Sequence, residues 1–245
     1  MPTRSAARPA PPLVLVTGAS QGIGADIALA FAAEAKARLI LVARNEVNLA
    51  TVAMRARQAG AKSAEGIGCD VTKAREVDLL ARTVLARYRQ PPDVLINNAG
   101  WFQPRSLSQM EPAEFDAVVA ANLHSAFYVT RAFAPAMTQR KRGDIFFTAS
   151  VASLRAFPQG GAYVAAKHGM LGLARAWREE LRPCGIRVMT VLPGATVSPS
   201  WEGAGVKPER MMASEDVAAV FVDAWRKSER TVMEEIVLRP PLGDV

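Results

Sequence analysis

Residues 13–24 read LVLVTGASQGIG and decide the fold. Leu13–Gly18 is a continuous apolar run that ends in glycine, a pattern typical of a strand buried on both faces of a parallel sheet. A helix is predicted to follow from Ile23 to Ala37. Three glycines lie at the junction: Gly18, Gly22 and Gly24. Glycine permits a tight turn, and the free N–H groups at a helix start attract a pyrophosphate. A glycine-rich turn without a ligand is the alternative interpretation.

Apolar runs and helical patterns alternate through the rest of the chain. Further strands are predicted at Leu39–Val42, Gly66–Cys69, Asp93–Ile96, Asp144–Ala149, Ile186–Leu192 and Glu235–Leu238. Further helices are predicted at Glu46–Gln58, Lys73–Tyr88, Pro112–Met137, Gly161–Arg178 and Glu215–Lys227. This alternation predicts an α/β, doubly wound Rossmann fold, with a seven-stranded parallel sheet and helices on both faces. The eight-stranded barrel would need another unit and usually has its phosphate-binding glycines late in the chain.

The composition predicts one large domain. The chain has 245 residues, of which 50% are hydrophobic, and we expect a Rossmann domain over residues 13–245 after a flexible tail, MPTRSAARPAPP, at residues 1–12. No apolar run approaches the length of a membrane span, and the first residues lack a signal-peptide core, so we expect a cytoplasmic protein without a membrane partner. Cys69 and Cys184 are too few for a disulfide framework or a clustered metal site, so we expect reduced, structural cysteines and no metal.

The net charge of +7 and the pI near 9.8 raise the possibility of nucleic-acid binding. Apart from QRKR at Gln139–Arg142, however, the basic residues are scattered among acidic ones, and aromatic residues do not interleave with them. We therefore predict no nucleic-acid partner. A positive field would still attract an anionic cofactor.

Residues 148–169, TASVASLRAFPQGGAYVAAKHG, combine groups suited to proton chemistry. Tyr163 and Lys167 are four apart in a predicted helix, so both side chains lie on one face. A tyrosine has a pKa of about 10, and a nearby ammonium is expected to lower it. Ser150 ends a strand, where an open α/β sheet presents groups to a ligand. Taken one at a time, Tyr163 could be a core aromatic residue, Lys167 a solvated lysine and Ser150 a hydroxyl in a loop. Their combination favours a catalytic role.

With these motifs the chain resembles the classical short-chain dehydrogenases/reductases over nearly all of its length after residue 12. TGASQGIG, residues 17–24, is similar to that family's TGxxxGxG pattern, and NNAG at Asn97–Gly100 matches its motif at the centre of the sheet. Four residues fall on the family's catalytic positions: Asn122, Ser150, Tyr163 and Lys167. The resemblance implies that the tyrosine is the acid or base, the lysine lowers its pKa and holds the nicotinamide ribose, the serine orients the carbonyl, and the asparagine holds a water.

The resemblance also implies a cofactor-binding set along the strand ends. Its members are Gly18, Ser20, Gln21, Gly22, Ile23, Gly24, Arg44, Asn45, Asp70, Val71, Asn98, Ala99, Gly100, Tyr163, Lys167, Pro193, Gly194 and Thr196. Asp70 in CDVT is expected to face the adenine, and Pro193–Gly194 to begin the segment that covers the nicotinamide. Thr196 and Ser198 depart from the aliphatic residue and the threonine that the family often has there.

Arg44 indicates which nicotinamide cofactor is used. NAD binding calls for an acidic residue at the end of the second strand, but Ala43 stands there and Arg44 follows it. Arginine pairs with a 2′-phosphate, whereas an acid would repel it, so the chemistry favours NADP(H). A solvated surface arginine is the alternative.

The predicted substrate pocket is aromatic. Its candidate residues are Trp101, Phe157 and Trp201, with Phe102, Met211 and Met212 as neighbours. Such a surface suits a flat or apolar carbonyl compound, although these residues could instead cover the sheet edge or a subunit interface. The sequences PGATVSPSW, MMASEDVAA and RTVMEEIVLRPPLGD are similar to those of bacterial sepiapterin-reductase-type members of the family.

From these observations we expect an NADPH-dependent reductase of a small, planar or dicarbonyl substrate, with Tyr163 as proton donor. A non-catalytic dinucleotide-binding sensor and a 3-oxoacyl thioester reductase remain alternatives. The predicted helices Pro112–Met137 and Gly161–Arg178 resemble those at the family's oligomer interfaces. They carry apolar residues beyond what one sheet contact needs: Phe127, Phe133, Met170 and Leu173. We therefore expect a homodimer or homotetramer.

Overall fold

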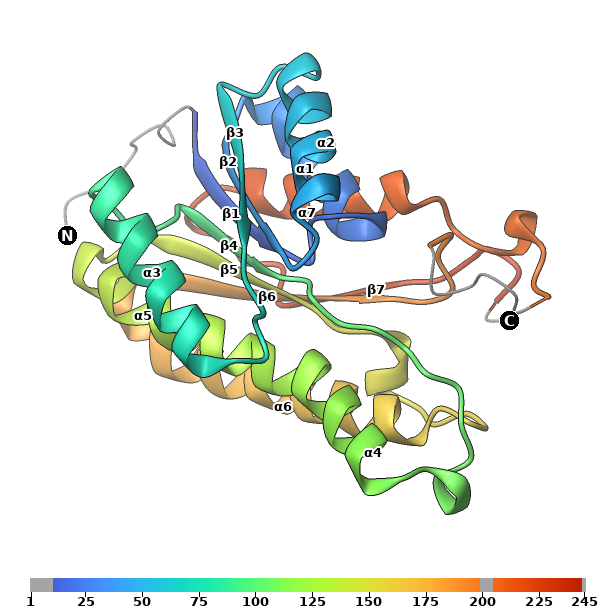
Figure 1. The fold of residues 1–245 in the computed structure, drawn as a ribbon. Coiled ribbons are helices and arrows are strands. Elements are labelled where there is room, and N and C mark those ends of the chain that lie inside the picture. Colours follow the sequence, from blue (N-terminus) through green and yellow to red (C-terminus); the bar gives the residue numbers. More distant parts are fainter. Residues whose placement is uncertain (1–10, 199–204, 244–245) are drawn as a thin grey trace.

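The computed structural model describes residues 11–198 and 205–243, and within these residues one seven-stranded parallel sheet forms the centre of the molecule (Figure 1). The strands are β1 (Leu13–Thr17), β2 (Arg38–Ala43), β3 (Ser63–Gly68), β4 (Val94–Asn97), β5 (Gly143–Thr148), β6 (Ile186–Pro193) and β7 (Glu235–Leu238). Their order, β3-β2-β1-β4-β5-β6-β7, reverses direction between β1 and β4. The predicted doubly wound fold is therefore confirmed, and its switch point lies beside β1.

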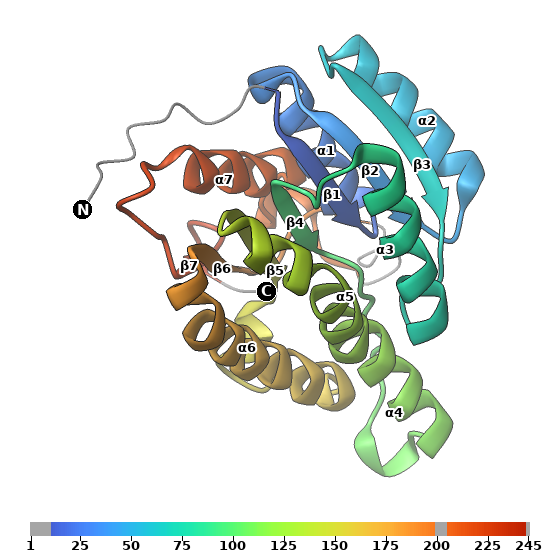
Figure 2. The same cartoon turned by 90° about the vertical axis from the view of Figure 1, so that its left-hand side faces the viewer.

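Helices cover both faces of the sheet (Figure 2). They are α1 (Gly22–Ala35), α2 (Glu46–Gln58), α3 (Ala74–Tyr88), α4 (Pro112–Val119), α5 (Ser125–Arg140), α6 (Gly161–Leu181) and α7 (Ser214–Arg226). One layer holds α1, α2 and α7, and the other holds α3, α5 and α6. None of the described helices has the length and hydropathy to span a bilayer.

Side-chain alternation along the strands divides the core into two. On β5, Phe146 packs with the α1 and α7 layer, whereas Ile145 and Phe147 pack with the α5 and α6 layer. Successive strand residues point to opposite faces, so a strand covered on both faces must be apolar at every position. This explains why the central strands are continuous apolar runs.

The edge strand β3 differs from the sequence expectation. It spans Ser63–Gly68 rather than the predicted Gly66–Cys69, and most of its residues are partly or fully exposed. An edge strand with little burial has a weak hydrophobic pattern, so the sequence does not define the residues at which it begins and ends.

The helix predicted at Pro112–Met137 is also interrupted. Helix α4 ends at Val119, a π-helical turn covers Ala120–His124, and α5 then begins at Ser125. Asn122 lies in this turn, fully buried, and its side-chain Nδ2 donates to the carbonyl oxygen of Val118 at 3.0 Å. A side chain that takes up a helical carbonyl disturbs the regular ladder, and such bulges are frequent at functional sites.

The core predicts which aromatic residues stabilise the fold. Phe146 is fully buried, and its ring lies 5.3 Å from that of Phe221 on α7. Phe146→Ala should lower the free energy of unfolding by about 3–5 kcal/mol, because it removes the ring and leaves a cavity. Leu79→Ala, at a position 59% exposed on α3, should change it by no more than about 0.5 kcal/mol. Urea unfolding of both variants provides the test, and equal losses would contradict this account of the core.

Candidate active site

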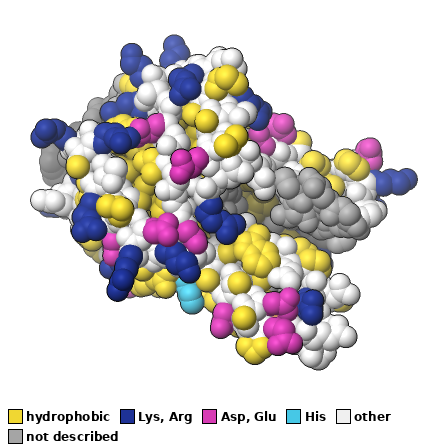
Figure 3. Space-filling model, viewed as in Figure 1, with side chains coloured by type: hydrophobic (Ala, Val, Ile, Leu, Met, Phe, Trp, Pro, Cys, Tyr) yellow, Lys and Arg dark blue, Asp and Glu magenta, His cyan; other side chains and the backbone are white. Residues whose placement is uncertain are grey.

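A cavity of about 1530 Å³ opens at the carboxyl ends of the strands, beside the switch point. Figure 3 shows the surface hollowed between the region of α1 and α2 and the region of α4. Every described residue predicted as catalytic or cofactor-binding lines this cavity, and so do Trp101, Phe102 and Phe157. Trp201 and the predicted tail, apart from Pro11 and Pro12, lie outside the described residues. The sequence patterns therefore converge on one place.

The glycine turn is packed tightly against the end of β4. Gly18 has a φ of +66°, and a Cβ there would lie 2.8 Å from Ala99 Cα. A Cβ on Gly24 would collide with the Gly18 carbonyl oxygen and the Asn98 side chain. Gln21, the N-cap of α1, makes no side-chain capping bond, so N–H groups at this helix start remain available to an anion. The turn fits a pyrophosphate.

The far end of the cavity carries positive charge. Arg44 and Lys73 line it together with Asp70. Burial acts to raise the pKa of the Asp70 carboxyl, but hydrogen bonds from the Thr72 hydroxyl and N–H and the charges of Arg44 and Lys73 lower it overall. Asp70 is thus an ionised acceptor beside two cations. This end suits a ligand with hydrogen-bond donors and a negative charge.

The predicted catalytic residues come together from three elements. Ser150 follows β5, where its hydroxyl accepts from Ala152 N–H at 3.1 Å and donates to the Pro193 carbonyl oxygen at 3.4 Å. Tyr163 and Lys167 lie on α6, and Lys167 Nζ is 5.4 Å from the centroid of the Tyr163 ring. The lysine is 3% exposed, whereas the tyrosine is partly exposed to the cavity.

Asn122 reaches the same region from the π-helical turn. Its Nδ2 donates to the Trp101 carbonyl oxygen at 2.8 Å, while its Oδ1 has no hydrogen-bond partner among the described residues. A Cβ on Gly100 would collide with this oxygen and lie 3.7 Å from Lys167 Nζ. Glycine at position 100 therefore leaves room for the amide oxygen of Asn122.

The expected effect of the lysine on Tyr163 is not what the structure shows. Burial raises the pKa of the Tyr163 hydroxyl, and a hydrogen bond with Ser150 partly opposes that rise. Burial also lowers the pKa of Lys167 from 10.5 to about 7, and its Nζ donates to the Thr148 carbonyl oxygen at 2.8 Å. The prediction of a lowered tyrosine pKa is therefore wrong. Both side chains are desolvated, and the lysine Nζ donates its hydrogen bond to the Thr148 carbonyl oxygen rather than to the tyrosine.

Three of the aromatic residues predicted for the substrate side line the cavity. Trp101 and Phe157 are 37% and 38% exposed and line the cavity with Phe102. Met211 and Met212 are not among its lining residues in the described chain, and Met212 instead packs against the α1 and α7 core. Their assignment to the pocket was wrong.

Sequence reasoning missed one wall of the cavity. It is formed by one face of α4 and the residue that follows this helix. The missed residues include Ala113, Asp116, Ala117 and Ala120. The i, i+3, i+4 and i+7 spacing of the α4 residues was a usable signal, but it does not indicate which face of the helix meets the cavity. No group of three or more His, Cys, Asp or Glu in the described chain is placed to hold a metal ion.

Comparisons with known proteins agree with this geometry. The family model described as short chain dehydrogenase matches residues 12–207. Sepiapterin reductase of Chlorobaculum tepidum is 35% identical over 240 residues, covering 95% of this chain and 98% of that protein. A putative ketoacyl reductase of Streptomyces coelicolor is 34% identical, covering 94% of this chain and 83% of its own. The chain therefore belongs to the short chain dehydrogenase family.

Solved structures show the same fold. An alcohol dehydrogenase from the archaeon Thermococcus sibiricus, complexed with 5-hydroxy-NADP, has a TM-score of 0.86 and 28% identity, covering 94% of this chain and 97% of that one. A metagenomic short-chain oxidoreductase in complex with NADP has a TM-score of 0.81 and 36% identity, with the same coverage of both chains.

The buried Lys167 predicts a pH dependence of stability. At pH values below about 7 both the folded and the unfolded chain hold the lysine proton, and the burial penalty is complete. As pH rises from about 7 towards 10, the folded lysine releases its proton while the unfolded chain keeps it, so the free energy of unfolding should rise. This group contributes at most about 1.4 kcal/mol per pH unit.

Urea unfolding of the cofactor-free protein at about pH 7, 8 and 9 measures this slope. Lys167→Met should flatten it, because the group that titrates is gone. Lys62→Met, at an exposed lysine, should leave the slope of the wild-type protein unchanged. Parallel profiles for the wild type and Lys167→Met would show that the ammonium is not desolvated.

Proposed function

We propose that the chain is an NADPH-dependent reductase of ketones or aldehydes. The observation that supports this most strongly is that one cavity joins the glycine turn after β1 to Ser150, Tyr163, Lys167 and Asn122. A binding module or sensor would need the glycine turn but not a buried lysine, a tyrosine and a serine in mutual reach. The complete set therefore favours an enzyme over a non-catalytic dinucleotide-binding protein.

The cavity fits NADP(H). The glycine turn and the start of α1 would hold the pyrophosphate, Asp70 would accept from the adenine, and Arg44 would pair with the 2′-phosphate. Two structural neighbours, the Thermococcus sibiricus enzyme and the metagenomic oxidoreductase, were solved with 5-hydroxy-NADP and NADP. When bound, the reduced cofactor supplies the hydride that is transferred to the carbonyl carbon.

The protein's own residues then manage the carbonyl oxygen and its proton. Ser150 would orient the oxygen by a hydrogen bond, and the Tyr163 hydroxyl, kept protonated by burial, would donate the proton. Lys167, whose pKa is lowered to about 7, would then return a proton to the Tyr163 hydroxyl. Asn122 Oδ1, which lacks a partner in the described chain, would hold a water beside this lysine. The reverse oxidation would use the same groups.

A compact, planar or dicarbonyl substrate fits the cavity best. Trp101, Phe102 and Phe157 offer aromatic surface, and the alanines of α4 leave room opposite them. Sepiapterin reductase is among the relatives that span nearly the whole chain, and levodione reductase is among the structural neighbours, with a TM-score of 0.86 and 27% identity over 94% of this chain and 96% of that one. A 3-oxoacyl thioester remains the second candidate, because ketoacyl reductases also match most of the chain.

Assembly and location stay predictions. Phe133 and Met170, expected on the oligomer surface, are fully buried in the core of the chain itself and offer no contact to a partner. Phe127 is 38% exposed on α5 and stacks on Trp177 of α6 at 6.5 Å. We propose that this aromatic face of α5 and α6 forms a homodimer or homotetramer contact, and that the enzyme acts in the cytoplasm.

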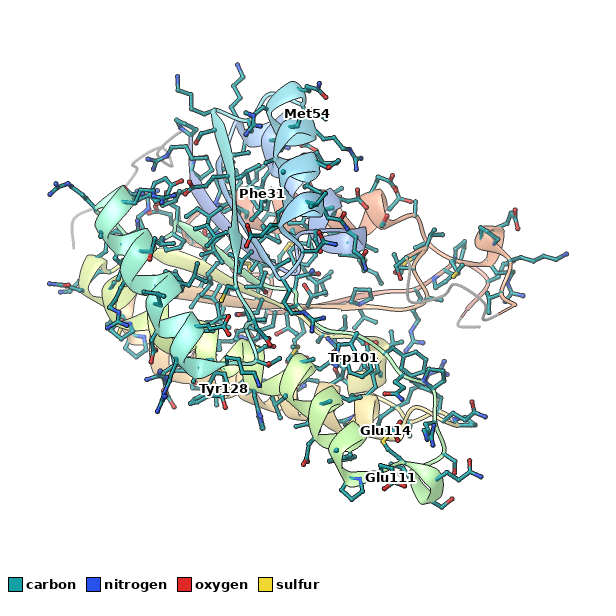
Figure 4. The ribbon with its side chains drawn as sticks, viewed as in Figure 1. Phe31, Met54, Trp101, Glu111, Glu114 and Tyr128 are labelled. Atoms are coloured by element: carbon teal, nitrogen blue, oxygen red, sulfur yellow. The ribbon has the colours of Figure 1, made fainter. Side chains whose placement is uncertain are left out.

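The role of Tyr163 is tested by removing its hydroxyl. Tyr163→Phe should keep NADPH affinity and lose about 10²- to 10⁴-fold in turnover, because proton donation is lost while the ring remains. Turnover is followed optically as NADPH oxidation with a panel of aromatic ketones, vicinal diketones and acyl thioesters. Tyr128→Phe on α5, away from Trp101 (Figure 4), should keep full activity.

Normal turnover of Tyr163→Phe would remove this residue from the mechanism. Activity confined to long acyl thioesters would instead contradict the compact substrate and favour the second candidate. The first result tests the role of Tyr163 as proton donor, and the second tests the substrate class.

The cofactor assignment is tested by reversing one charge. Arg44→Asp should weaken NADPH binding relative to NADH by about 10-fold or more, because a charge-assisted pair with the 2′-phosphate becomes a repulsion. Fluorescence titration of both nucleotides gives the ratio. Arg82→Asp, on an exposed position of α3 that does not line the cavity, changes the net charge equally and should not alter the ratio. A constant ratio in Arg44→Asp would place the phosphate elsewhere.

A further inference from the structure

Two side chains lie against the ring of Tyr163. Lys167, one turn further along α6, places its Nζ 5.4 Å from the ring centroid. Phe102, in the segment after β4, lies edge to face with the tyrosine, with centroids 5.3 Å apart and planes at 70°. The ring is thus contacted both from its own helix and from a separate segment of the chain.

Phe102 is in turn held by Phe157. Their ring centroids are 5.9 Å apart at an interplanar angle of 59°. The Phe157 ring lies directly on Gly160, the residue before α6, where a Cβ would collide with it. Three rings, Phe157, Phe102 and Tyr163, therefore form a continuous row that starts and ends at the beginning of α6.

Hydrogen bonds hold the residues on both sides of Phe102. The Trp101 carbonyl oxygen accepts from Asn122 Nδ2 at 2.8 Å, and Gln103 Nε2 donates to Glu114 Oε1 at 3.1 Å. Further along, the Arg105 N–H donates to the Gln159 carbonyl oxygen at 2.9 Å. Figure 4 shows Trp101 and Glu114 on neighbouring parts of this region. These bonds hold the segment that places Phe102 against the tyrosine ring.

A tyrosine on a helix needs such a contact. The helix fixes the Cβ, but the second side-chain torsion joins an sp³ to an sp² carbon and has broad, shallow minima. An aromatic neighbour that meets the ring edge to face restricts that torsion, because other ring angles lose the favourable quadrupole geometry or collide. The aromatic neighbour therefore determines the direction in which the tyrosine hydroxyl points.

We propose that Phe102 is a positioning residue that fixes the ring of Tyr163 and shields it from water, so that the hydroxyl faces the substrate carbonyl. The inference rests on the proposed role of Tyr163 as proton donor. Phe102 itself makes no proton transfer. Its contribution is to orientation, and a misplacement of about 1 Å at a reacting group costs on the order of 100-fold in rate.

The pH profile separates positioning from general damage. The groups that face Tyr163 are Lys167 on α6 and Ser150 after β5, and Asp116 and Arg155 line the cavity further out. Burial raises the pKa of the tyrosine, so opening its ring to water should lower that pKa. For a proton donor, the alkaline limb of kcat should then move to lower pH.

Phe102→Ala is the test variant, assayed with whichever carbonyl compound the wild-type enzyme reduces. We expect kcat to fall by about 10- to 100-fold with the alkaline limb shifted to lower pH, while NADPH affinity, measured by fluorescence titration, stays as in the wild type. Phe102→Tyr keeps the ring and should retain most of the activity. Phe115→Ala, at an aromatic position on α4 that does not line the cavity, should have normal kcat and pH profile.

Normal kcat and an unshifted limb in Phe102→Ala, with Tyr163→Phe inactive, would overturn this inference and leave the proposed function intact. A rise in KM alone would overturn it too, since Phe102 would then only bind substrate. Full activity of Tyr163→Phe would overturn the proposed function itself. If the alanine variant fails to fold, Phe102→Leu fills most of the volume without a ring, and normal kcat in that variant would overturn the inference.

Discussion

The hydroxyl of Thr17 holds the two halves of the site together. It donates to the Ile96 carbonyl oxygen at 3.2 Å and accepts from the N–H groups of Asn98 and Ala99 at 3.0 and 3.1 Å. Asn98 Nδ2 returns a bond to the Thr17 carbonyl oxygen at 3.1 Å. These bonds join the end of β1 to the end of β4, where the strand order reverses. The close approach they impose is what makes glycine necessary at 18 and 24, because a Cβ at either position would meet backbone or the Asn98 amide.

Burial at the reaction centre and charge at the far end divide the cavity electrostatically. Lys167 is surrounded by protein and loses most of its preference for the charged form. Arg44 and Lys73 are exposed to water at the other end. Under the proposed function, an elongated anionic ligand would be attracted by the exposed end, and proton transfer would take place beside the buried lysine. The basic residues scattered along the sequence add to this field.

Periodicity was enough to predict the sheet, and motif spacing was enough to predict residues that line one cavity. Runs such as Leu13–Gly18 are apolar at every position because both faces of the central strands are covered, a constraint that leaves a clear signal. The edge strand β3 has no such constraint and was misplaced. The π-helical turn at Asn122 depends on a side-chain amide that takes the Val118 carbonyl, which helix propensity does not describe. The direction of the Tyr163 pKa depends on how far water is excluded, and spacing along one helix contains no information on that.

The substrate wall has a physical origin different from that of the sheet. It consists of the segment after β4 and the segment before α6, which meet through the Arg105 N–H bond to the Gln159 carbonyl, the Leu107 side chain on Gly161 and the Phe157 ring on Gly160. Gln159 adopts a φ of +59°, a strained value for a residue with a Cβ that persists only where the surroundings enforce it. Few of these contacts involve the hydrophobic core, so side chains in the wall can change at little cost to the fold. Under the proposed function, contacts between these two segments would determine substrate choice, while the residues proposed for proton transfer and cofactor binding lie at the ends of strands and on helices.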